Sequence, residues 1–561
     1  MYVSSCLVTW FMSDIHTKHL IEGYLRFIQT TLGKHVVPLA KYDAKGQKKR
    51  EYHEKTRKDV LEKIATWIDT ESKTARCMWI TGKAGVGKST IGIQVAERLE
   101  DENSLYAQFF VTRDITDTTD PDNIFPTMAR QLAERSPFAA VVIHDKLKDI
   151  PRSTVKKLSL EQALAIFVEP LRVIAQFEDK VVVVVDGVDE LANTDPDILS
   201  EVTAVLCTII QELPSKIRIL VFSRPELPIV TNIRLLDIDW LDLRLEESKF
   251  DVEQMVHTEL PKLAKANKWE DWPGLEREKK FCELAGGHLG WARFAIAWIV
   301  QELRQSFQKE IRRDELFAEL SELPSGDLEG LYSLIFRRIT PPESSAKNRT
   351  RFLQGFQIII GFLAIIQEPL TIGTIIDLVS SDLESSGLER FNIVDFLNNL
   401  SSIFMDGTDL MNIETIPKAH KSVFDYLTSN RPDHSLRISP REHHIHMVKT
   451  CFRIFREELC FNVGRIKTSH KRNDELSDSE MQPISPHITY VCKSVGRHLE
   501  KAEEHDEFLS DIDDFMKNKF LQWLEVLSLT KEVDSAKFTL ETMDMHVGVS
   551  TIPSRAIFNV K

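Results

Sequence analysis

A short glycine-rich run between residues 82 and 89 constrains the fold of this chain more than any other feature. It reads Gly82-Lys83-Ala84-Gly85-Val86-Gly87-Lys88-Ser89, and Thr90 follows it. Glycines at this spacing let successive backbone N–H groups turn inward, where they bind phosphate oxygens. The lysine and the serine that end the run fit this chemistry, because the ammonium reaches the β- and γ-phosphates and the hydroxyl ligates Mg²⁺. We therefore predict that residues 82–90 bind the phosphates of a nucleotide.

The residues around this run decide between a phosphate-binding loop and an ordinary glycine-rich turn. An apolar stretch at 77–80 leads directly into the run, and Ile91, Val95 and Leu99 follow at the spacing of one helix face. Strand, glycine loop and helix, in that order, are the context that a phosphate-binding loop requires. The surrounding sequence therefore favours the phosphate-binding loop over the ordinary turn.

Acidic residues follow a second apolar run. Residues 181–185 are valines, a pattern typical of a central strand that is buried on both faces, and Asp186 comes next. A carboxylate at the end of such a strand holds Mg²⁺, so Ser89 and Asp186 are the predicted metal-binding residues. Asp189 and Glu190 are candidates for polarising an attacking water or for binding in the magnesium shell. The alternative for these two acids is helix capping, because acidic residues are favoured at helix starts.

Two further polar residues are candidates for phosphate contacts. Arg224 follows an apolar stretch at 217–222, which places a guanidinium at the edge of the predicted sheet, where it is able to sense a γ-phosphate. The alternative is a surface arginine on a proline turn. His420 begins a helical segment, and taken alone it is explained by a helix cap or a solvated side chain. The histidines within 443–446 have no carboxylate or cysteine partner positioned by the sequence, so we predict no metal site there.

Strands and helices alternate in the first part of the chain. Apolar stretches at 105–111 and 217–222 predict strands in addition to the valine run, and helical patterns lie between them. This alternation predicts an α/β fold whose parallel sheet is covered by helices on both faces. Beyond the sheet, helical patterns dominate at 250–263, 281–303 and 330–338. We therefore predict a multidomain protein whose second half is mostly α-helical.

Composition narrows the classes of function. The formal net charge of −14 argues against general nucleic-acid binding, which needs a basic face that displaces counterions. A basic run at 41–58 is explained by a solvated linker. The seven cysteines are scattered and fit a reducing compartment. No apolar stretch reaches the ~20 residues of a membrane span, so we expect a soluble, cytoplasmic protein without membrane contact.

Together these motifs resemble the NACHT family of STAND-type nucleoside triphosphatases, especially its fungal members and the nephrocystin-3 N-terminal type. The resemblance extends over residues 52–530. Other segments that carry it are Lys55-Thr56-Arg57, Phe109-Phe110 with Arg113, Phe125-Pro126-Thr127-Met128-Ala129, Gly187 after the acid, Phe222-Ser223-Arg224-Pro225-Glu226, Ala285-Gly286-Gly287 and His420-Lys421-Ser422. Gly290-Trp291-Ala292-Arg293 departs from the family, because it puts a glycine and an arginine into a helix that is otherwise more apolar.

The resemblance implies an order of domains. They are a weakly patterned lead-in at 1–51, a nucleotide-binding domain at 52–240, a helical domain at 241–338, a winged-helix-like domain at 351–430, a helical region at 431–530 and a tail at 531–561. In related families a winged-helix histidine contacts the β-phosphate of ADP and holds the closed state, and His420 matches that motif. The resemblance leaves open whether the chain is a truncated gene product or a receptor that senses through its helical region.

The function implied is a signalling switch in an innate-immunity-like or heterokaryon-incompatibility-like role. We expect it to be closed with ADP and open with ATP, to use Mg²⁺, to hydrolyse nucleotide slowly and to form a homo-oligomer on activation, with protein partners that the sequence does not identify. GTP is disfavoured because Asn267-Lys268-Trp269-Glu270 departs at its acid from the guanine-binding pattern. Two alternatives stay open, namely a working P-loop ATPase of the loader or remodeller class and a nucleotide-binding scaffold without turnover.

Overall fold

The computed structural model describes most of the 561 residues. The described ranges are 15–33, 36–43, 57–70, 76–112, 115–149, 159–194, 196–234, 236, 238–243, 248–270, 272–306, 308–388, 392–404, 408–467, 480–503 and 507–547. Lys55, Thr56 and Arg113, which carry part of the family resemblance, lie outside these ranges, as do residues 44–56 of the basic run at 41–58. The chain forms two compact units, Met1–Leu331 and Tyr332–Lys561.

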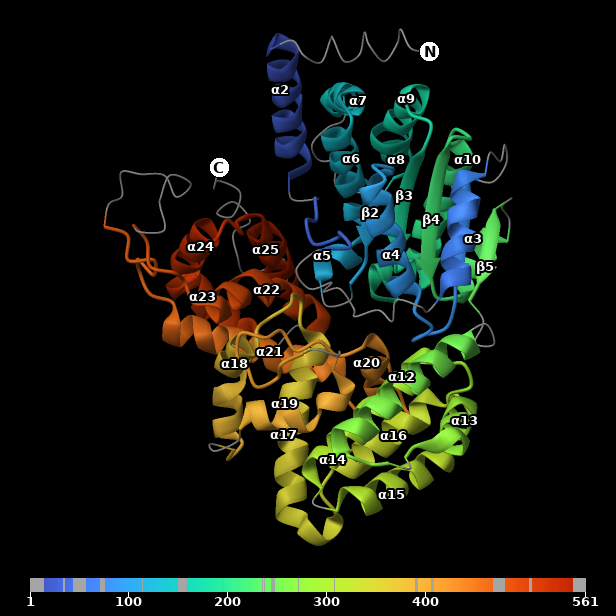
Figure 1. Ribbon diagram of the computed structural model, residues 1–561. Coiled ribbons are helices and arrows are strands. Elements are labelled where there is room, and N and C mark those ends of the chain that lie inside the picture. The colour runs from blue at the N-terminus through green and yellow to red at the C-terminus, as the bar shows by residue number, and fades with distance from the viewer. Residues whose placement is uncertain are drawn as a thin grey trace. The chain divides into compact units, whose positions relative to one another are not determined.

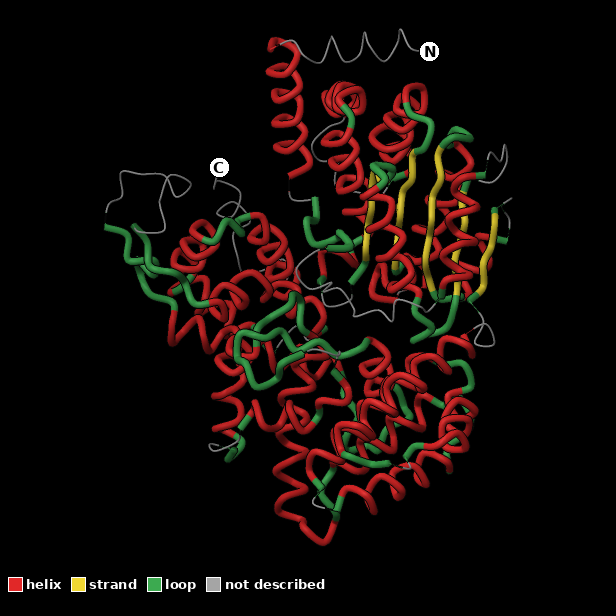
Figure 2. The backbone as a smooth tube through the Cα atoms, viewed as in Figure 1, coloured by secondary structure: helices red, strands yellow, loops and turns green. Residues whose placement is uncertain are grey.

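The first unit is built on a five-stranded parallel sheet in the order β2-β3-β4-β1-β5 (Figures 1 and 2). The strands are β1 (Cys77–Thr81), β2 (Leu105–Phe110), β3 (Val181–Asp186), β4 (Ile217–Ser223) and β5 (Asp239–Asp242). Because the strands are parallel, their carboxyl ends lie at one edge of the sheet, where ligands bind in folds of this kind. Apart from His420, the predicted site residues lie at or just after the ends of β1, β3 and β4, which are neighbours in the sheet.

Helices cover both faces of the sheet, as predicted. Along β1, Cys77 and Trp79 face one hydrophobic core, whereas Met78 and Ile80 face the other. The first core is covered by α2 (Ile15–Leu32), α6 (Ile124–Arg135), α7 (Pro137–Asp149), α9 (Glu169–Phe177), α10 (Pro196–Glu212) and α11 (Leu227–Ile233). The second core lies under α3 (Lys58–Asp69) and α4 (Lys88–Asp101), which Figure 1 shows together on one side of the sheet. Two short helices, α5 (Thr116–Thr119) and α8 (Leu160–Ala163), also belong to the first unit, and Ala163 of α8 is buried in the first core.

Four helices follow the sheet within the first unit: α12 (Lys249–Asn267), α13 (Gly274–Ala285), α14 (Leu289–Gln305) and α15 (Lys309–Ser321). The predicted helix over 281–303 is divided between α13 and α14. The chain turns at Gly286 (φ 56°) and Gly287 (φ 81°), whose left-handed backbone is the usual way for a helix to end. The next helix, α16 (Leu328–Ile339), contains the boundary between the two units.

The second unit is helical in its described parts. Its helices are α17 (Ala346–Ile365), α18 (Ile372–Ser385), α19 (Ile393–Asn399), α20 (Lys421–Thr428), α21 (Pro440–Glu458), α22 (Pro486–Ala502), α23 (Leu509–Asn518), α24 (Phe520–Leu529) and α25 (Asp534–Val547). Phe404 and Ala419 form an isolated antiparallel bridge within the segment predicted to be winged-helix-like. Helix α25 lies in the predicted tail and packs on α22, where Gly496 leaves room for Thr539. Among the described helices, none has both the length and the apolar character needed to cross a bilayer.

Candidate functional site

The glycine-rich run forms the connection between β1 and α4, as predicted. Gly85 (φ 75°) and Gly87 (φ 92°) adopt left-handed backbone, which other residues rarely tolerate. The Lys88 ammonium donates to the carbonyl oxygens of Gly82 at 2.7 Å and of Lys83 at 3.0 Å. The lysine therefore already binds oxygen atoms of the loop, and phosphate oxygens are acceptors of the same kind.

Charged residues from the neighbouring strand ends converge on Lys88. Burial lowers the pKa of the Lys88 ammonium to about 8, and the Asp189 carboxylate opposes this shift while the Arg224 guanidinium adds to it. Asp186 and Glu190 also act on Lys88 electrostatically. The structure thus brings together five of the residues that the sequence predicted from separate motifs.

Asp186 ends β3 and is almost completely buried. Gly187 follows it with φ 82°, and its N–H donates to the Phe222 carbonyl of β4 at 2.9 Å. A Cβ at Gly187 would lie 3.1 Å from the Cβ of Val111, so a larger residue there would press on the chain after β2. The small residue after the acid is therefore required by the backbone turn that fixes Asp186 at the edge of the sheet.

Asp189 and Glu190 lie in the first turn of a 3₁₀ helix, Val188–Thr194. This position agrees with the capping alternative, but the Asp189 carboxylate is directed to Arg224. It accepts the Arg224 backbone N–H at 2.9 Å, and its other oxygen lies 3.4 Å from the Arg224 Nε. Glu190 is partly exposed. Arg224 is thus held by the loop after β3 and is not a free surface side chain.

Arg57, directly before α3, contacts the glycine loop from a distant part of the sequence. Its guanidinium donates to the Val86 carbonyl at 2.7 Å, and its Nε lies 3.4 Å from the Asp251 carboxylate of α12. Asp251 also accepts the Arg57 backbone N–H at 2.9 Å. The family resemblance includes Arg57, but no local pattern relates it to the loop, because its partners lie 29 and 194 residues away.

The start of α14 also contacts the glycine loop. His288 caps this helix by accepting the Trp291 N–H on Nδ1 at 3.1 Å, and its ring packs against the loop, where a Cβ added at Gly85 would lie 2.6 Å from the His288 Cε1. Burial lowers the pKa of His288 to about 4, so the ring is neutral near pH 7. Gly290, which departs from the family pattern, donates its N–H to the Gly85 carbonyl at 3.2 Å. A Cβ at Gly290 would lie 3.3 Å from the Gly85 Cα, so the glycine allows this close approach.

His420 belongs to the second unit and caps α20. Its Nδ1 accepts the Ser422 N–H at 3.2 Å and lies 2.6 Å from the Ser422 Oγ. The Ser422 Oγ is in turn 2.7 Å from the Tyr332 hydroxyl. The helix cap that the sequence offered as the simple explanation is therefore present.

The histidines within 443–446 have separate partners in the second unit. His446 pairs with Asp382 at 3.1 Å, whereas the Nδ1 of His444 lies 2.9 Å from the Nδ1 of His498. In the described ranges, no group of three or more His, Cys, Asp or Glu side chains is arranged to hold a metal ion.

The residues at the glycine loop fit the phosphates of a nucleotide with Mg²⁺. The left-handed glycines give the backbone the curvature of an anion-binding nest, and Lys88 adds an ammonium donor. Ser89 and Thr90 lie in the first turn of α4, where the helix dipole favours negative charge. Asp186 offers the kind of oxygen ligand that Mg²⁺ prefers. These residues therefore suit both the nucleotide phosphates and a Mg²⁺ ion.

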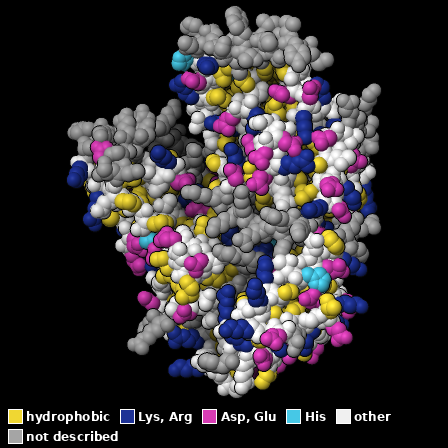
Figure 3. Space-filling model, in the orientation of Figure 1, with side chains coloured by type: hydrophobic (Ala, Val, Ile, Leu, Met, Phe, Trp, Pro, Cys, Tyr) yellow, Lys and Arg dark blue, Asp and Glu magenta, His cyan; other side chains and the backbone are white. Residues whose placement is uncertain are grey.

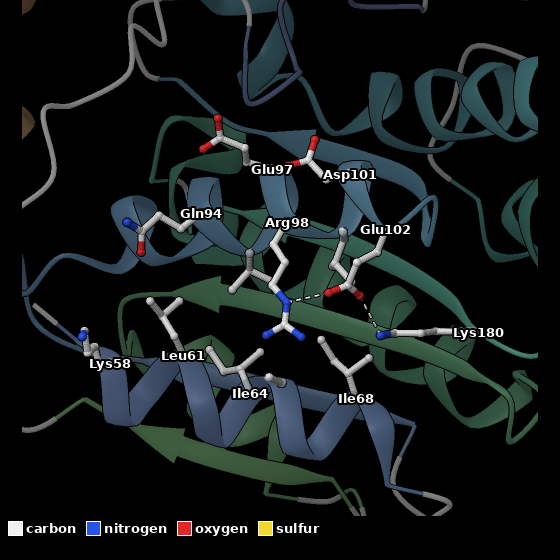
Figure 4. A pocket seen from close by; sticks show the side chains of 13 residues that line it. Lys58, Leu61, Ile64, Ile68, Gln94, Glu97, Arg98, Asp101, Glu102 and Lys180 are labelled. Carbon is white, nitrogen blue, oxygen red and sulfur yellow. Dashed lines mark hydrogen bonds and ion pairs between the residues drawn. The ribbon is translucent and has the colours of Figure 1, made fainter. Parts of the chain in front are cut away.

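A separate groove lies between α3 and α4 (Figure 4). Its volume is about 520 Å³, and Leu61, Ile64 and Ile68 of α3 form an apolar wall. At one end, Glu102 accepts from Arg98 at 2.6 Å and from Lys180 at 2.9 Å. None of the residues that line the groove belongs to the glycine loop, so it is distinct from the phosphate site.

A parallel sheet with a glycine loop after β1 and a buried acid at the end of β3 defines a P-loop nucleotide-binding protein. Residues 55–224 match the family model described as nephrocystin 3, N-terminal. This match confirms the predicted resemblance over the part of the chain that carries the loop, Asp186 and Arg224. No curated protein matches the sequence.

Solved structures similar to this chain include Cdc6p from Pyrobaculum aerophilum, with 17% identity, a TM-score of 0.30, and coverage of 71% of this chain and 95% of that one. A signal transduction ATPase with numerous domains and a tetratricopeptide repeat sensor, from Pyrococcus horikoshii, is 11% identical with a TM-score of 0.39, over 88% of this chain and 56% of that one. Drosophila ORC bound to DNA is 16% identical with a TM-score of 0.25, over 66% of this chain and 94% of that one. These are distant likenesses, and the function proposed below rests on the residues of this chain.

Proposed function

We propose that this protein is a nucleotide-gated signalling switch that is closed with ADP and that opens and self-associates with ATP. The observation that supports it best is the convergence of Asp186 and Arg224 on Lys88 at the end of three neighbouring strands. These groups supply a carboxylate for Mg²⁺, a guanidinium for the γ-phosphate and an ammonium for the β- and γ-phosphates. A switch of this kind needs all three, because it has to distinguish a triphosphate from a diphosphate.

Each residue has a defined task in this proposal. The backbone N–H groups of residues 82–90 surround the phosphates, and Ser89 and Asp186 hold Mg²⁺, which neutralises charge on the phosphate oxygens when it is bound. Arg224, oriented by Asp189, detects the γ-phosphate. Glu190 is partly exposed beside these residues and orients water, which gives the protein a slow hydrolytic activity that resets the switch.

His420 has the tautomer that a phosphate contact needs. Because its Nδ1 accepts the Ser422 N–H, the proton of the neutral ring lies on Nε2. The Nε2–H group is a donor suited to a phosphate oxygen of ADP, and such a contact would hold a winged-helix-like domain at 351–430 in the closed state. The cap and the phosphate contact use different nitrogens, so one role does not exclude the other.

A histidine alone does not supply enough free energy for the switch. Changing a population from 1:99 to 99:1 takes about 5.5 kcal/mol of differential binding. One hydrogen bond to a charged group contributes about 1.5–3 kcal/mol. The remainder has to come from protein contacts that differ between the closed and open states, which include those that form on self-association.

The proposal assigns no nucleic-acid partner. The chain carries a formal net charge of −14, and acidic and basic side chains are interspersed over the sheet-containing unit on the face drawn in Figure 3. A loader or remodeller acting on DNA would need a continuous basic surface. DNA binding that weakens steeply with salt would favour that alternative over the switch.

The switch is tested by its oligomeric state in each nucleotide. Light scattering after size exclusion should give a monomer with ADP and a larger assembly with ATP. His420→Ala should self-associate with ADP as well. His420→Asn should do the same, although asparagine keeps the helix cap. The matched control is His434→Ala, which changes an exposed histidine of the same unit. Identical profiles for ATP and ADP in the unmodified protein would rule the switch out.

A further inference from the structure

Successive carbonyl groups of the glycine loop are bound by residues outside it. The Val86 carbonyl accepts from the Arg57 guanidinium at 2.7 Å, and the Gly85 carbonyl accepts from the Gly290 N–H at 3.2 Å. The His288 ring packs against the same stretch of the loop, because a Cβ added at Gly85 would lie 2.6 Å from the His288 Cε1. Each of these contacts comes from a segment outside the strand–loop–helix unit. They reach the loop from the residue before α3 and from the start of α14.

These contacts fix the direction of the N–H groups as well. In a planar trans peptide unit the C=O of one residue and the N–H of the next point in opposite directions. Holding the carbonyls of Gly85 and Val86 away from the loop centre therefore turns the N–H groups of Val86 and Gly87 toward it. Those N–H groups are the ones that a phosphate-binding loop presents to its ligand. Glycines at 85 and 87 would otherwise let the peptide units rotate freely.

We propose that Arg57 and His288 are positioning residues that hold the phosphate-binding N–H groups of the glycine loop inward, and that phosphate binding is therefore coupled to the docking of α12 on Arg57 and of α14 on the loop. This inference rests on the proposed nucleotide site and goes beyond it, because it assigns the organisation of that site to helices that follow the sheet. Arg57 connects both parts, since the Asp251 carboxylate of α12 binds its guanidinium and its backbone N–H.

The coupling is reciprocal. If docking of α12 and α14 raises the affinity of the loop for phosphate, bound phosphate must stabilise the docking by the same factor. The nucleotide is then sensed by the following helices through the outside of the loop, without direct contact to the ligand. Gly290 allows this arrangement, because a Cβ there would meet the His288 ring at 3.1 Å and the Gly85 Cα at 3.3 Å.

The first test compares ADP with adenosine, which lacks the phosphates. Calorimetry should give an ADP affinity about tenfold lower for Arg57→Ala, the effect of one lost hydrogen bond to a charged group, and an unchanged adenosine affinity. Arg57→Lys should recover part of the loss, because lysine keeps one donor and the charge toward Asp251. Arg218→Ala is the matched control. Arg218 is a buried arginine that also donates to backbone carbonyls, of Ser215 and Thr70, away from the loop.

The second variant separates the loop contact from the helix cap. His288→Asn keeps a side chain that caps α14 but lacks the ring that packs against Gly85. Its ADP affinity should fall severalfold while its thermal stability without nucleotide stays close to that of the unmodified protein. Equal loss of ADP and adenosine binding, or a loss matched by Arg218→Ala, would assign these residues a general structural role and overturn the proposal.

Hydrogen exchange on the unmodified protein tests the coupling without any variant. ADP should slow exchange in peptides that contain the Gly290 amide, which donates to the loop, and leave the amides at the start of α18 unchanged. If ADP binds but does not slow amide exchange in this segment, the coupling is wrong while the nucleotide site still stands. A protein that fails to bind ADP at all, with Lys88→Ala indistinguishable from it, would instead refute the nucleotide site on which the coupling rests.

Discussion

Asp189 and Arg224 form a two-point contact across the carboxyl edge of the sheet. One carboxylate oxygen accepts the Arg224 backbone N–H at 2.9 Å, and the other lies 3.4 Å from the Arg224 Nε. The acid is 4% exposed and the loops it joins follow β3 and β4. Asp189 therefore positions the guanidinium, which is a different task from polarising water.

Asp189→Asn should reduce the discrimination between ATP and ADP. The amide can still accept the backbone N–H, but it loses the charge that orients the guanidinium toward a γ-phosphate. We expect the ratio of ATP to ADP affinity to fall roughly tenfold, the effect of about 1.4 kcal/mol. Equilibrium binding of both nucleotides measures it, with Glu190→Gln as the control. A ratio that stays the same in Asp189→Asn would refute the positioning role.

Nucleotide binding should take up protons at mildly alkaline pH. Burial lowers the pKa of Lys88 to about 8, so near this pH only part of the population carries the charge. A phosphate beside the ammonium favours the charged form and raises its pKa again. Calorimetry of ADP binding in buffers of different ionisation enthalpy should detect uptake near pH 8 that disappears toward pH 6. Lys88→Arg should abolish the uptake, and uptake that persists in this variant would assign the proton to another group.

The second unit should lose stability in weak acid through two buried histidines. Burial lowers the pKa of His444 to about 3, helped by Lys501 and His443, and burial lowers the pKa of His498 well below 6.5, helped by His444 and Lys501. The unfolded chain binds protons first, near pH 6.5, so stability is full above this pH and declines as pH falls toward 3.

Between pH 6.5 and the lowered pKa, each histidine should reduce the free energy of unfolding by about 1 kcal/mol for every pH unit of acidification. Unfolding in urea between pH 7 and pH 5 measures it, and His444→Gln should make the dependence shallower. His446→Gln is the informative control. Asp382 raises the pKa of His446, so protonation of this residue in weak acid stabilises the fold, and its removal should make the loss of stability steeper. If both variants change the pH dependence of the free energy of unfolding in the same direction, this explanation is wrong.

Gly187→Ala should destabilise the first unit. The new Cβ would lie 3.1 Å from the Val111 Cβ at a residue with φ 82°, which costs about 1–3 kcal/mol. Gly23→Ala is the matched substitution, because Gly23 lies exposed in α2 with no atom within 4 Å of its added Cβ. Urea unfolding should show a loss for the first variant and none for the second. Equal effects would mean that the turn after Asp186 tolerates a side chain.

The parts of this site that could be predicted from the sequence are the local ones. The loop at 82–89 depends on glycine spacing between a strand and a helix, and Asp186 depends on the valine run before it, so both were found. The roles of Arg57 and His288 were not found, because each depends on a contact with a part of the loop that is distant in sequence. No spacing rule predicts which carbonyl a buried guanidinium will reach.

Some helix boundaries also could not be predicted from local sequence patterns. Helical patterns predicted helices at 250–263 and 330–338, where α12 and α16 lie, but the break between α13 and α14 depends on the left-handed backbone at Gly286 and Gly287. Helix α25 was not predicted, because its helical face becomes apparent only where it packs on α22.

We expect the glycine loop to bind nucleotide through its phosphates. Calorimetric titration of ADP with Mg²⁺ into the unmodified protein and into Lys88→Ala tests it most directly. We predict saturable one-to-one binding to the unmodified protein and a loss of at least about tenfold in Lys88→Ala, the effect of removing one charge-assisted contact. Both proteins should unfold at similar temperatures without nucleotide. Equal ADP affinity in the two proteins, or no binding to either, would show that the loop is not a nucleotide-phosphate site.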